Sequence, residues 1–519
     1  MTEPMILTDE QRDAIDTMMS KKSQGACLMG SEVGTGKTLV SVEFAKRFGA
    51  RVTLIIAPLQ TLGAPEEGGW HGTFEQQEFP HPFRRIDSEL SGRAALADYQ
   101  WNVPGVYFIG QEYFVRLGWK KVQQFNRNKT AKMKLNKKTN TMEEVWKKER
   151  LPLWGRTVPD LVIFDEVHRA QNGDSATHET LMGGAGQRGG LNGRYKIGAS
   201  GTPYGNSFNG AWAVTRWLWP HLIDSSIYVW RSKWCEVVYD PFAVRNQKVV
   251  GELVEGAFFN SLPCYIRIES DLDIELDAKD VIVTISPEQR RIYTELENSM
   301  VAWIQDNPMV TSFPIVKRIR QRQATLGVPT LIPDGEGGFD VRFALDCESV
   351  KIDSTWSILE QDFEGEPTVI FTDSQIFADV IVYRLNSRYG EDSARKWSGK
   401  VTRKLRDQHK KDFIEGKFKY LVAVIRSSGT GTDGLQFAAR NMLYFSSDDS
   451  RIDNEQSIGR LVRRGQTADK VRLRRLIAKD TIDSGQLSKH MRDALRANKI
   501  LKKRGNDARK QLPARSFRF

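Results

Sequence analysis

The sequence predicts an α/β protein built on parallel β-sheets flanked by helices, and three patterns support this fold class. Residues 27–48 hold a short apolar run, a glycine-containing loop and an amphipathic helix pattern. Residues 161–164 (LVIF) form a continuous apolar run, which is typical of a strand buried on both faces of a sheet. Three further apolar runs, at 368–372, 420–425 and 441–446, alternate with helical stretches, as the strands of a parallel sheet do.

Length and composition indicate a folded chain of several domains. The 519 residues suggest two to four domains, and 40% hydrophobic residues with 13 tryptophans are ample for large cores. The beginning, MTEPMILTDEQRDAID, lacks the basic and apolar regions of a signal peptide, and no apolar run approaches the length that spans a membrane. The four cysteines are scattered without a CxxC pair, so we expect no metal site or disulfide framework, and a cytoplasmic location.

The net charge of +11 is concentrated in two segments. Residues 119–150 hold 11 Lys and Arg against 3 Asp and Glu, and residues 489–519 hold 11 against 2. Local basic patches of this kind suggest a polyanionic partner such as nucleic acid. The alternative for each segment is a solubilising loop or tail.

The loop that follows the first apolar run has the pattern of a phosphate-binding loop. Gly34 and Gly36 allow successive backbone N–H groups to turn toward a phosphate, and the next helix adds its positive N-terminal end. Lys37 is expected to reach the β- and γ-phosphates of ATP, and Thr38 to hold Mg²⁺. Ser31 stands where GxxxxGK[ST] has its first glycine, and a small residue can keep that geometry. The expected ATP-binding set is Gln11, whose amide can bind the edge of adenine, Val33, Gly34, Thr35, Gly36, Lys37 and Thr38.

A pair of carboxylates follows the apolar run at 161–164. Carboxylates at the carboxyl end of a parallel strand can lie beside a phosphate-binding loop. Asp165 would then bind Mg²⁺ through water, and Glu166 would activate the attacking water as a general base. Without the phosphate-binding loop, an ordinary acidic turn would be the better interpretation.

Residues 456–466 (QSIGRLVRRGQ) gather three arginines. If this stretch is helical, Gln456, Arg460 and Arg463 or Arg464 stack along one face. Because like charges on one face repel, we expect an anionic group opposite them. A solvated basic helix is the alternative.

The order of these motifs resembles that of the superfamily 2 helicases, and within them the Swi/Snf-type DNA translocases. The resemblance rests on SEVGTGKT at 31–38, DEVH at 165–168, GTPYGN at 201–206 and, most specifically, GRLVRRGQ at 459–466. It covers nearly the whole chain. GTPYGN is similar to the GTPxxN of that subgroup rather than to the Ser-Ala-Thr of DEAD-box RNA helicases. A stand-alone bacterial or viral member is expected rather than a chromatin remodeller.

The resemblance implies two RecA-like lobes with ATP in the cleft between them. Arg460 and Arg463 would then be arginine fingers that face the γ-phosphate, and Gln456 would orient the attacking water or bind the phosphate. Arg464 ranks below Arg463, because it falls one step off the contact face. The expected domains are a first lobe at 1–290 with the basic insertion at 119–150, a helical linker or insertion at 291–345, a second lobe at 346–487 and a basic tail at 488–519.

The same resemblance implies that nucleic acid is held by loops away from the ATP. Hydroxyl and backbone N–H groups in such loops bind phosphates without reading sequence. Two departures from the family pattern stand near them: Trp70 follows PLQTL later than expected, and Asp433 replaces an asparagine. The expected contacts are Gln60, Thr61, Gln111, Ser428, Gly429 and Thr430.

The expected function is ATP-driven translocation on double-stranded DNA by a monomer that uses ATP and Mg²⁺ and does not associate with membranes. The alternative is a fork- or junction-specific helicase that catalyses branch migration in replication, recombination or repair, with the insertion at 119–150 as a wedge. A third hypothesis is a DNA-binding or nucleotide-switch protein that does not hydrolyse ATP. The complete set of Lys37, Thr38, Asp165, Glu166 and both arginine fingers argues against the third.

Overall fold

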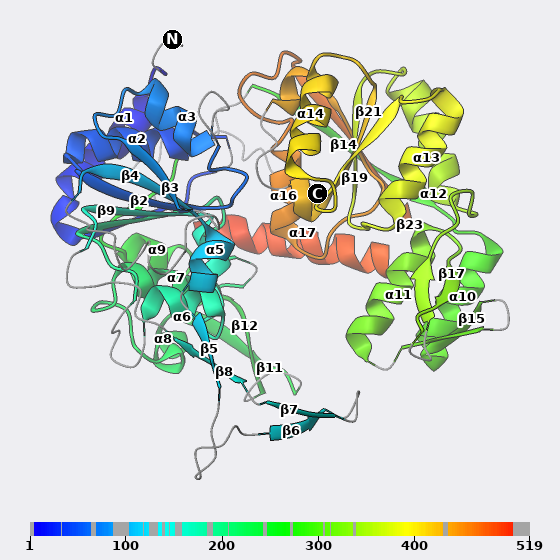
Figure 1. The fold of residues 1–519 in the computed structure, drawn as a ribbon, viewed down its shortest axis with the longest axis horizontal. Helices are drawn as coiled ribbons and strands as arrows, with labels where there is room; N and C mark the ends of the chain where they lie inside the picture. Colours follow the sequence, from blue (N-terminus) through cyan, green and yellow to red (C-terminus); the bar gives the residue numbers. More distant parts are fainter. Residues whose placement is uncertain are drawn as a thin grey trace. The chain divides into compact units, whose positions relative to one another are not determined.

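The protein folds as two compact units, whose main bodies are residues 1–270 and 271–498. The ribbon of the computed structural model is drawn in Figure 1. The structure describes residues 5–32, 34–63, 69–86, 103–117, 119–123, 133–136, 141–144, 146–150, 158–183, 190–205, 207–241, 246–269, 273–304, 307–311, 313–335, 339–428 and 434–501.

The first unit is built on a seven-stranded, wholly parallel sheet with the order β13-β1-β10-β9-β2-β4-β3. Every residue of β1, β2, β4, β9 and β10 is buried, which explains why these strands are mostly apolar in the sequence. The strands are β1 Ala26–Met29, β2 Val52–Ala57, β3 Phe83–Ile86, β4 Gly105–Gly110, β9 Leu161–Asp165, β10 Tyr195–Ala199 and β13 Tyr265–Ile266.

Helices cover both faces of this sheet (Figure 1). A capping box between Thr8 and Gln11 starts α1, and Gly49 ends α2 in the left-handed conformation at φ 70°. The helices α1 Asp9–Ser20, α2 Lys37–Phe48 and α3 Gly69–Gln76 lie on one face, and α5 Gln111–Leu117, α6 Ala176–Met182 and α7 Asn209–Leu218 on the other. After α7 come α8 Ile227–Trp234, the hairpin of β11 Cys235–Tyr239 and β12 Gln247–Glu252, and α9 Ala257–Ser261.

The basic insertion at 119–150 forms β-structure. Strands β5 Trp119–Gln123 and β8 Trp146–Arg150 pair antiparallel, and so do β6 Met133–Asn136 and β7 Thr141–Glu144. The insertion is therefore a pair of two-stranded ribbons that interrupts the chain between α5 and β9 (Figure 1).

The second unit is built on a six-stranded, wholly parallel sheet with the order β14-β23-β22-β19-β21-β20. The three strands predicted from apolar runs are present as β19, β21 and β22, and each is fully buried. The strands are β14 Glu275–Val283, β19 Thr368–Thr372, β20 Ala394–Trp397, β21 Tyr420–Val424, β22 Asn441–Tyr444 and β23 Lys470–Ala478.

Two hydrophobic cores lie on the two faces of this sheet. Ile370 of β19 belongs to one core, and its neighbours Val369 and Phe371 belong to the other, as the two-residue period of a strand requires. Helices α12 Val350–Ser357 and α13 Phe377–Tyr389 contribute to the core of Ile370, whereas α14 Arg403–Ile414 and α16 Arg451–Ile458 contribute to the other. The predicted fold class, α/β with two parallel sheets flanked by helices, is confirmed.

The boundary between the units lies earlier than the expected position at 290. Strand β14 pairs with β23 along its whole length, so residues 275–283 are part of the second sheet. The division between the units accordingly falls between Ser270 and Asp271. The sequence placed β14 in the first lobe because its partner β23 lies almost two hundred residues further along the chain.

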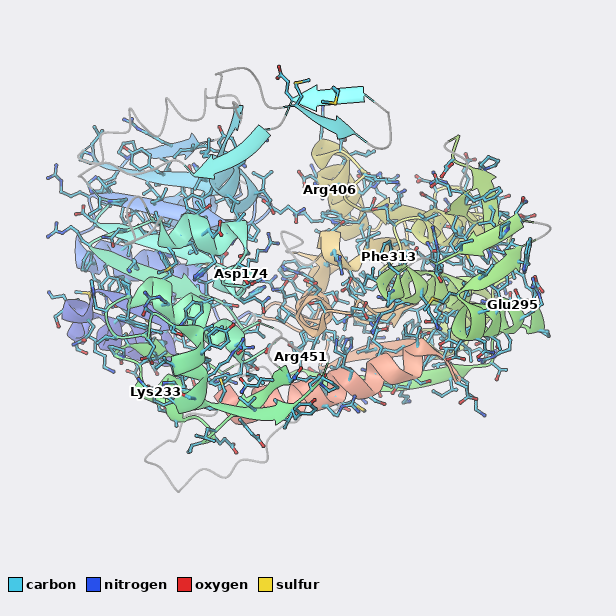
Figure 2. The ribbon with its side chains drawn as sticks, turned by 90° about the horizontal axis from the view of Figure 1, so that it is seen from below. Asp174, Lys233, Glu295, Phe313, Arg406 and Arg451 are labelled. Carbon is cyan, nitrogen blue, oxygen red and sulfur yellow. The ribbon has the colours of Figure 1, made fainter. Side chains whose placement is uncertain are left out.

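Residues 291–345, expected as a helical linker, contain hairpins as well as helices and pack into the second unit. Ile292 and Tyr293 of α10 share a core with Ile370 of β19, and the Gln289 side chain donates a 2.9 Å hydrogen bond to the Ala324 carbonyl of α11. The elements are α10 Pro287–Ser299, β15 Val301–Ile304, β16 Asn307–Val310, α11 Pro314–Leu326, β17 Thr330–Pro333 and β18 Phe339–Arg342. Glu295 in α10 and Phe313 just before α11 mark this region in Figure 2.

The C-terminal helix α17 spans Ile482–Leu501 and takes in the start of the expected tail at 488–519. His490 of this helix is buried and its Nε2 lies 3.2 Å from the Asp449 carbonyl, so the chain is still packed against the second unit at residue 490. The rest of the expected tail, after residue 501, lies outside the described residues. Within the described part of the chain, no helix combines the length and the apolar character needed to cross a membrane.

Candidate functional site

Three sequence motifs meet at the carboxyl edge of the first sheet. Met29 at the end of β1 is in register with Ala199 at the end of β10, and Ala199 is in register with Asp165 at the end of β9. The glycine-containing loop follows β1, the GTPYG stretch follows β10, and the carboxylate pair ends β9. Residues separated by up to 170 positions are thereby brought to one edge, where ligands bind in open α/β sheets.

The loop after β1 has the backbone geometry of a phosphate-binding loop. Gly34 and Gly36 both adopt the left-handed conformation, at φ 84° and 82°, which side chains rarely tolerate. Lys37 begins α2, and its Nζ donates to the carbonyl oxygens of Ser31 at 2.9 Å and Glu32 at 2.7 Å. The ammonium group thus lies across the loop. Thr38, the second residue of α2, is half-buried, and Val33 lies outside the described residues.

Gln11 braces this loop from α1. Its Nε2 donates to the Thr35 carbonyl at 2.8 Å, and its Oε1 accepts from the Thr8 backbone N–H at 3.0 Å. The side chain is buried, and a Cβ atom on Gly36 would come within 2.4 Å of Nε2. Both ends of the amide that was expected to bind adenine therefore contact the protein itself, and the close fit requires glycine at position 36.

Asp165 is buried at the end of β9 and accepts two hydrogen bonds. The indole Nε1 of Trp70 donates to Oδ2 and the backbone N–H of Glu166 donates to Oδ1, both at 2.9 Å. Burial raises the pKa of Asp165, and the neighbouring charge of Glu166 raises it further; the Trp70 bond and the charge of Lys37 oppose the rise. The sequence predicted the carboxylate and singled out Trp70 by its distance from PLQTL, but it did not indicate that the two residues, 95 positions apart, are hydrogen-bonded.

Glu166 has a strained backbone and an ionised side chain. Its φ is 49°, a left-handed conformation that is costly for any residue other than glycine and that clusters at functional sites. Burial raises the pKa of Glu166, but the hydrogen bond and charge of His168 and the charge of Lys37 outweigh burial and hold the pKa below its usual value. The pKa values of the two adjacent carboxyl groups are thus shifted in opposite directions.

His168 links the carboxylate pair to the stretch after β10. Its Nδ1 lies 3.1 Å from Glu166 Oε2 and 2.8 Å from the Ser200 hydroxyl, and His168 is buried. The same hydroxyl accepts from the Thr202 backbone N–H at 3.1 Å. The position of Glu166 is thus tied to the backbone of the GTPYG stretch.

The oxygen groups at this edge fit Mg²⁺ bound together with a nucleotide. Mg²⁺ is usually held by one or two carboxylates plus the phosphates of the substrate rather than by a protein cage. Asp165 and the Thr38 hydroxyl supply oxygen donors of that kind. Consistent with this mode, the described residues contain no cluster of three or more His, Cys, Asp or Glu arranged to hold a metal by themselves.

The arginines of 456–466 do not lie on one helix, so that expectation is wrong. Helix α16 ends at Ile458, and Gly459 follows as its C-cap. The chain then continues in tight turns, in which Arg460 N–H donates to the Ser457 carbonyl at 3.2 Å and Leu461 N–H to Ile458 at 3.1 Å. Leu461, which follows in these turns, is buried in the core of the second unit.

The turns give the three arginines different surroundings. Gln456 and Arg460 are buried at 7% and 8% exposure, Arg463 is half-buried and Arg464 is exposed. The ranking of Arg464 below Arg463 assumed one helical face, which the turns do not provide, so it stays a prediction.

The predicted nucleic-acid contacts fall in two kinds of surroundings. Gln60 and Thr61 are half-buried in the loop after β2, where the Thr61 hydroxyl donates to the Pro58 carbonyl at 3.0 Å. Gln111, by contrast, is 3% exposed and donates its amide N–H to the Asp165 carbonyl, so it supports the carboxylate and is not at the surface. Ser428 ends the short helix α15 Ile425–Ser428, and Gly429 and Thr430 lie outside the described residues.

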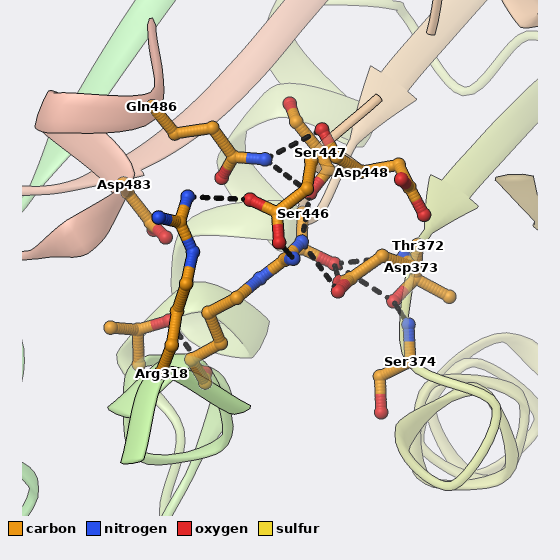
Figure 3. Close-up of polar contacts among 12 residues, drawn as sticks. Arg318, Thr372, Asp373, Ser374, Ser446, Ser447, Asp448, Asp483 and Gln486 are labelled. Atoms are coloured by element: carbon orange, nitrogen blue, oxygen red, sulfur yellow. Dashed lines mark hydrogen bonds and ion pairs between the residues drawn. The ribbon is translucent and has the colours of Figure 1, made fainter. Parts of the chain in front are cut away.

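The carboxyl edge of the second sheet holds a charged network that the sequence did not reveal. The loops after β19 and β22 are joined there by Ser446, whose hydroxyl donates to Asp373 at 2.5 Å (Figure 3). Arg322 of α11 forms ion pairs with Asp373 at 2.5 Å and Asp449 at 2.9 Å, and Arg318 pairs with Asp449 at 2.7 Å. Helix α11 thereby fixes both loops.

Comparison with known proteins identifies the class. A family model described as the SNF2-related domain matches residues 10–324, more than half of the chain. The chain therefore belongs to the SNF2-related family, and it is a helicase-like, DNA-dependent ATPase of the Swi/Snf type. Among solved structures, it is similar to the Sulfolobus solfataricus SWI2/SNF2 ATPase core in complex with dsDNA, with 17% identity, a TM-score of 0.38, and coverage of 94% of this chain and 91% of that one. No curated protein matches the chain.

Proposed function

We propose that this chain hydrolyses ATP to move along double-stranded DNA. The observation that carries the proposal is the register at the first sheet's carboxyl edge, which gathers the phosphate-binding loop, the carboxylate pair and the GTPYG stretch. Membership of the SNF2-related family supports DNA as the polymer on which the hydrolysis acts.

The first unit supplies the groups that hold ATP and activate water. Lys37, which bonds two carbonyls of its own loop, would exchange them for the β- and γ-phosphates. Glu166, ionised at neutral pH, would accept a proton from the attacking water. His168 and Ser200 hold that carboxylate in place.

Asp165 and Thr38 are the residues that would hold Mg²⁺. When bound, the ion neutralises the negative charge of the phosphates during their transfer. The raised pKa of Asp165 reflects a buried carboxylate that needs a positive charge beside it, and Lys37 supplies only part of that charge.

The second unit would supply Arg460 and Arg463 as arginine fingers and Gln456 as a group that orients water or phosphate. Arg460 and Gln456 are buried within the second unit, so their backbone positions are well held by the turns after α16. Arginine fingers stabilise negative charge in the transition state, and this increases the rate of hydrolysis by a factor of about 10³ to 10⁵. If these side chains act on ATP held by the first unit, hydrolysis would be coupled to relative movement of the two units.

Contacts to DNA phosphates would come from Gln60 and Thr61 in the first unit and from residues 428–430 in the second. The basic segments at 119–150 and 502–519 would add affinity that falls with salt. We propose that a monomer suffices, since each unit carries its part of the site on the same chain.

The test is ATP hydrolysis by the purified protein with no nucleic acid, single-stranded DNA, duplexes of increasing length, forks, four-way junctions and RNA. A Lys37→Ala variant is the control for contaminating ATPases. Stimulation that grows with duplex length supports the translocase. Stimulation restricted to forks or junctions supports branch migration instead, and stimulation by RNA alone contradicts both.

A further inference from the structure

Trp70 joins a predicted DNA-contacting loop to the predicted metal-holding carboxylate. Its backbone N–H donates to the Thr61 carbonyl at 2.9 Å, and its indole Nε1 donates to Asp165 Oδ2 at 2.9 Å. The side chain is 1% exposed. A single residue therefore bonds the loop after β2 through its backbone and the end of β9 through its ring.

The start of α3 is joined to the loop after β2 by backbone hydrogen bonds. Beside the Trp70 bond, the His71 N–H donates to the Leu62 carbonyl at 2.9 Å. Gly69 adopts φ 70°, and a Cβ atom there would come within 2.6 Å of the Thr61 carbonyl oxygen. The close approach leaves little room for the loop to shift without moving Trp70.

Gln111 reaches the same carboxylate residue from a second segment. It is the first residue of α5, directly after β4, and its Nε2 donates to the backbone carbonyl of Asp165. Its Oε1 is buried and has no hydrogen-bond partner within the described part of the chain. The amide is thus held by the bond to Asp165, at the edge where β4 and β9 flank β2.

We infer that Trp70 and Gln111 are positioning residues that couple DNA contact at the Gln60–Thr61 loop to the placement of Asp165. This inference rests on the proposed function. Contact of a duplex with the loop after β2 shifts Trp70, and the indole bond carries the shift to the Asp165 carboxylate. Gln111 holds the Asp165 backbone, so the change is confined to its side chain.

The inference requires that the indole N–H of Trp70, and not the aromatic ring alone, positions Asp165. Groups that hydrogen-bond to a metal ligand orient it, and their removal typically costs about 10- to 100-fold in metal affinity or activity. Trp70→Phe keeps an aromatic ring in the buried site but removes the donor. Trp217→Phe is a matched control, because Trp217 is also buried in the first unit and its indole donates to a backbone carbonyl, that of Leu191, at 3.0 Å.

The experiment measures two quantities for the wild type, Trp70→Phe, Gln111→Met and Trp217→Phe. The first is the dissociation constant of a fluorescent ATP analogue in Mg²⁺ and in EDTA. The second is the ratio of ATP hydrolysis with and without a long duplex. Thermal melting of each variant reports whether the first unit is folded.

For Trp70→Phe we expect the increase in affinity for the ATP analogue that Mg²⁺ provides to fall about 10-fold, while binding of the analogue in EDTA is unchanged. We also expect the ratio of ATP hydrolysis with and without the duplex to fall. Gln111→Met should show the same loss of Mg²⁺-dependent affinity. If Trp70→Phe matches Trp217→Phe in both quantities, the inference is wrong. If Trp70→Phe does not fold, an unchanged Mg²⁺ effect in Gln111→Met overturns it.

Different results would contradict the proposed function and the coupling through Trp70. A wild type that no nucleic acid stimulates contradicts the proposed function, yet the comparison of nucleotide binding in Mg²⁺ and EDTA still tests whether Trp70 positions Asp165. A stimulated wild type whose Trp70→Phe variant keeps full stimulation contradicts only the coupling.

Discussion

The Nδ1 atom of His168 lies 3.1 Å from Oε2 of Glu166, where His168 is buried and Glu166 is half-buried. This interaction counters the effect of burial and keeps Glu166 ionised, while the adjacent Asp165 has a raised pKa. The surroundings therefore move the pKa values of two adjacent carboxyl groups in opposite directions, and Glu166 is present as a carboxylate at neutral pH.

Glu166→Gln should abolish most hydrolysis while leaving nucleotide binding intact. A glutamine keeps the size of the side chain but cannot take a proton, and a general base contributes about 10²- to 10⁴-fold in rate. Single-turnover hydrolysis and binding of a fluorescent ATP analogue separate the two effects. A variant with wild-type turnover would remove the general-base assignment.

Arg463→Ala should slow hydrolysis by about 10³-fold or more and leave ATP affinity nearly unchanged, because a finger acts in the transition state. Arg464→Ala is the matched control, since that neighbour is exposed. Arg460 is a poorer target, because its burial makes loss of stability a competing explanation. Equal effects of the two substitutions, or a collapse of ATP binding in Arg463→Ala, would contradict the finger role.

Lys196→Met should stabilise the first unit at neutral pH and lose that advantage at high pH. Lys196 is 7% exposed in β10, and burial lowers its pKa to about 8 from an unfolded value near 10.5. Below pH 8 the folded state carries the full cost of the buried charge, about 3 kcal/mol, and the cost falls as pH rises from 8 to 10.5.

The substitution also removes the 2.6 Å bond from Nζ to the Trp217 carbonyl, worth about 1 kcal/mol. The net gain at pH 7 is then about 2 kcal/mol. Urea unfolding of both proteins at pH 7 and pH 10 measures it. A difference that does not change with pH would show that the buried ammonium is not destabilising.

Truncation after residue 501 should weaken DNA binding at low salt and flatten its salt dependence. Residues 502–519 hold seven Lys and Arg against one Asp. The cut should come no earlier, because the Gln486 amide of α17 donates to the Asp448 carbonyl at 2.6 Å and His490 is buried. For every DNA phosphate that the truncated protein no longer neutralises, the slope of log affinity against log salt should become shallower by about 0.9. An unchanged slope would leave these residues as a solubilising tail.

Much of the fold and part of the site could be predicted because the signals are local. The strands at 161–165 and 368–372 are continuous apolar runs, and the geometry around Gly36 follows from residues adjacent in sequence. The pairing of β14 with β23 joins segments far apart in sequence, and no local pattern indicates it. The unit boundary was therefore placed too late.

The missed parts of the site depend on tertiary contacts. Trp70 was noted only for its position after PLQTL, and no local pattern indicates that its indole donates to Asp165. The helix considered for 456–466 ends at Ile458 instead, and the chain continues in turns from which Leu461 enters the core of the second unit. Gln111 was expected at the surface because its side chain is polar. It follows a fully buried strand, however, and is itself buried.

The central claim, movement along duplex DNA driven by ATP, is tested most directly by displacement of a third strand from a triplex. The protein is loaded on a duplex that carries a triplex-forming oligonucleotide at one end. We predict release of the oligonucleotide with ATP, no release by Lys37→Ala, and a delay that lengthens with the duplex between loading site and triplex. Hydrolysis of ATP on the same duplex without any release of the third strand would contradict the account.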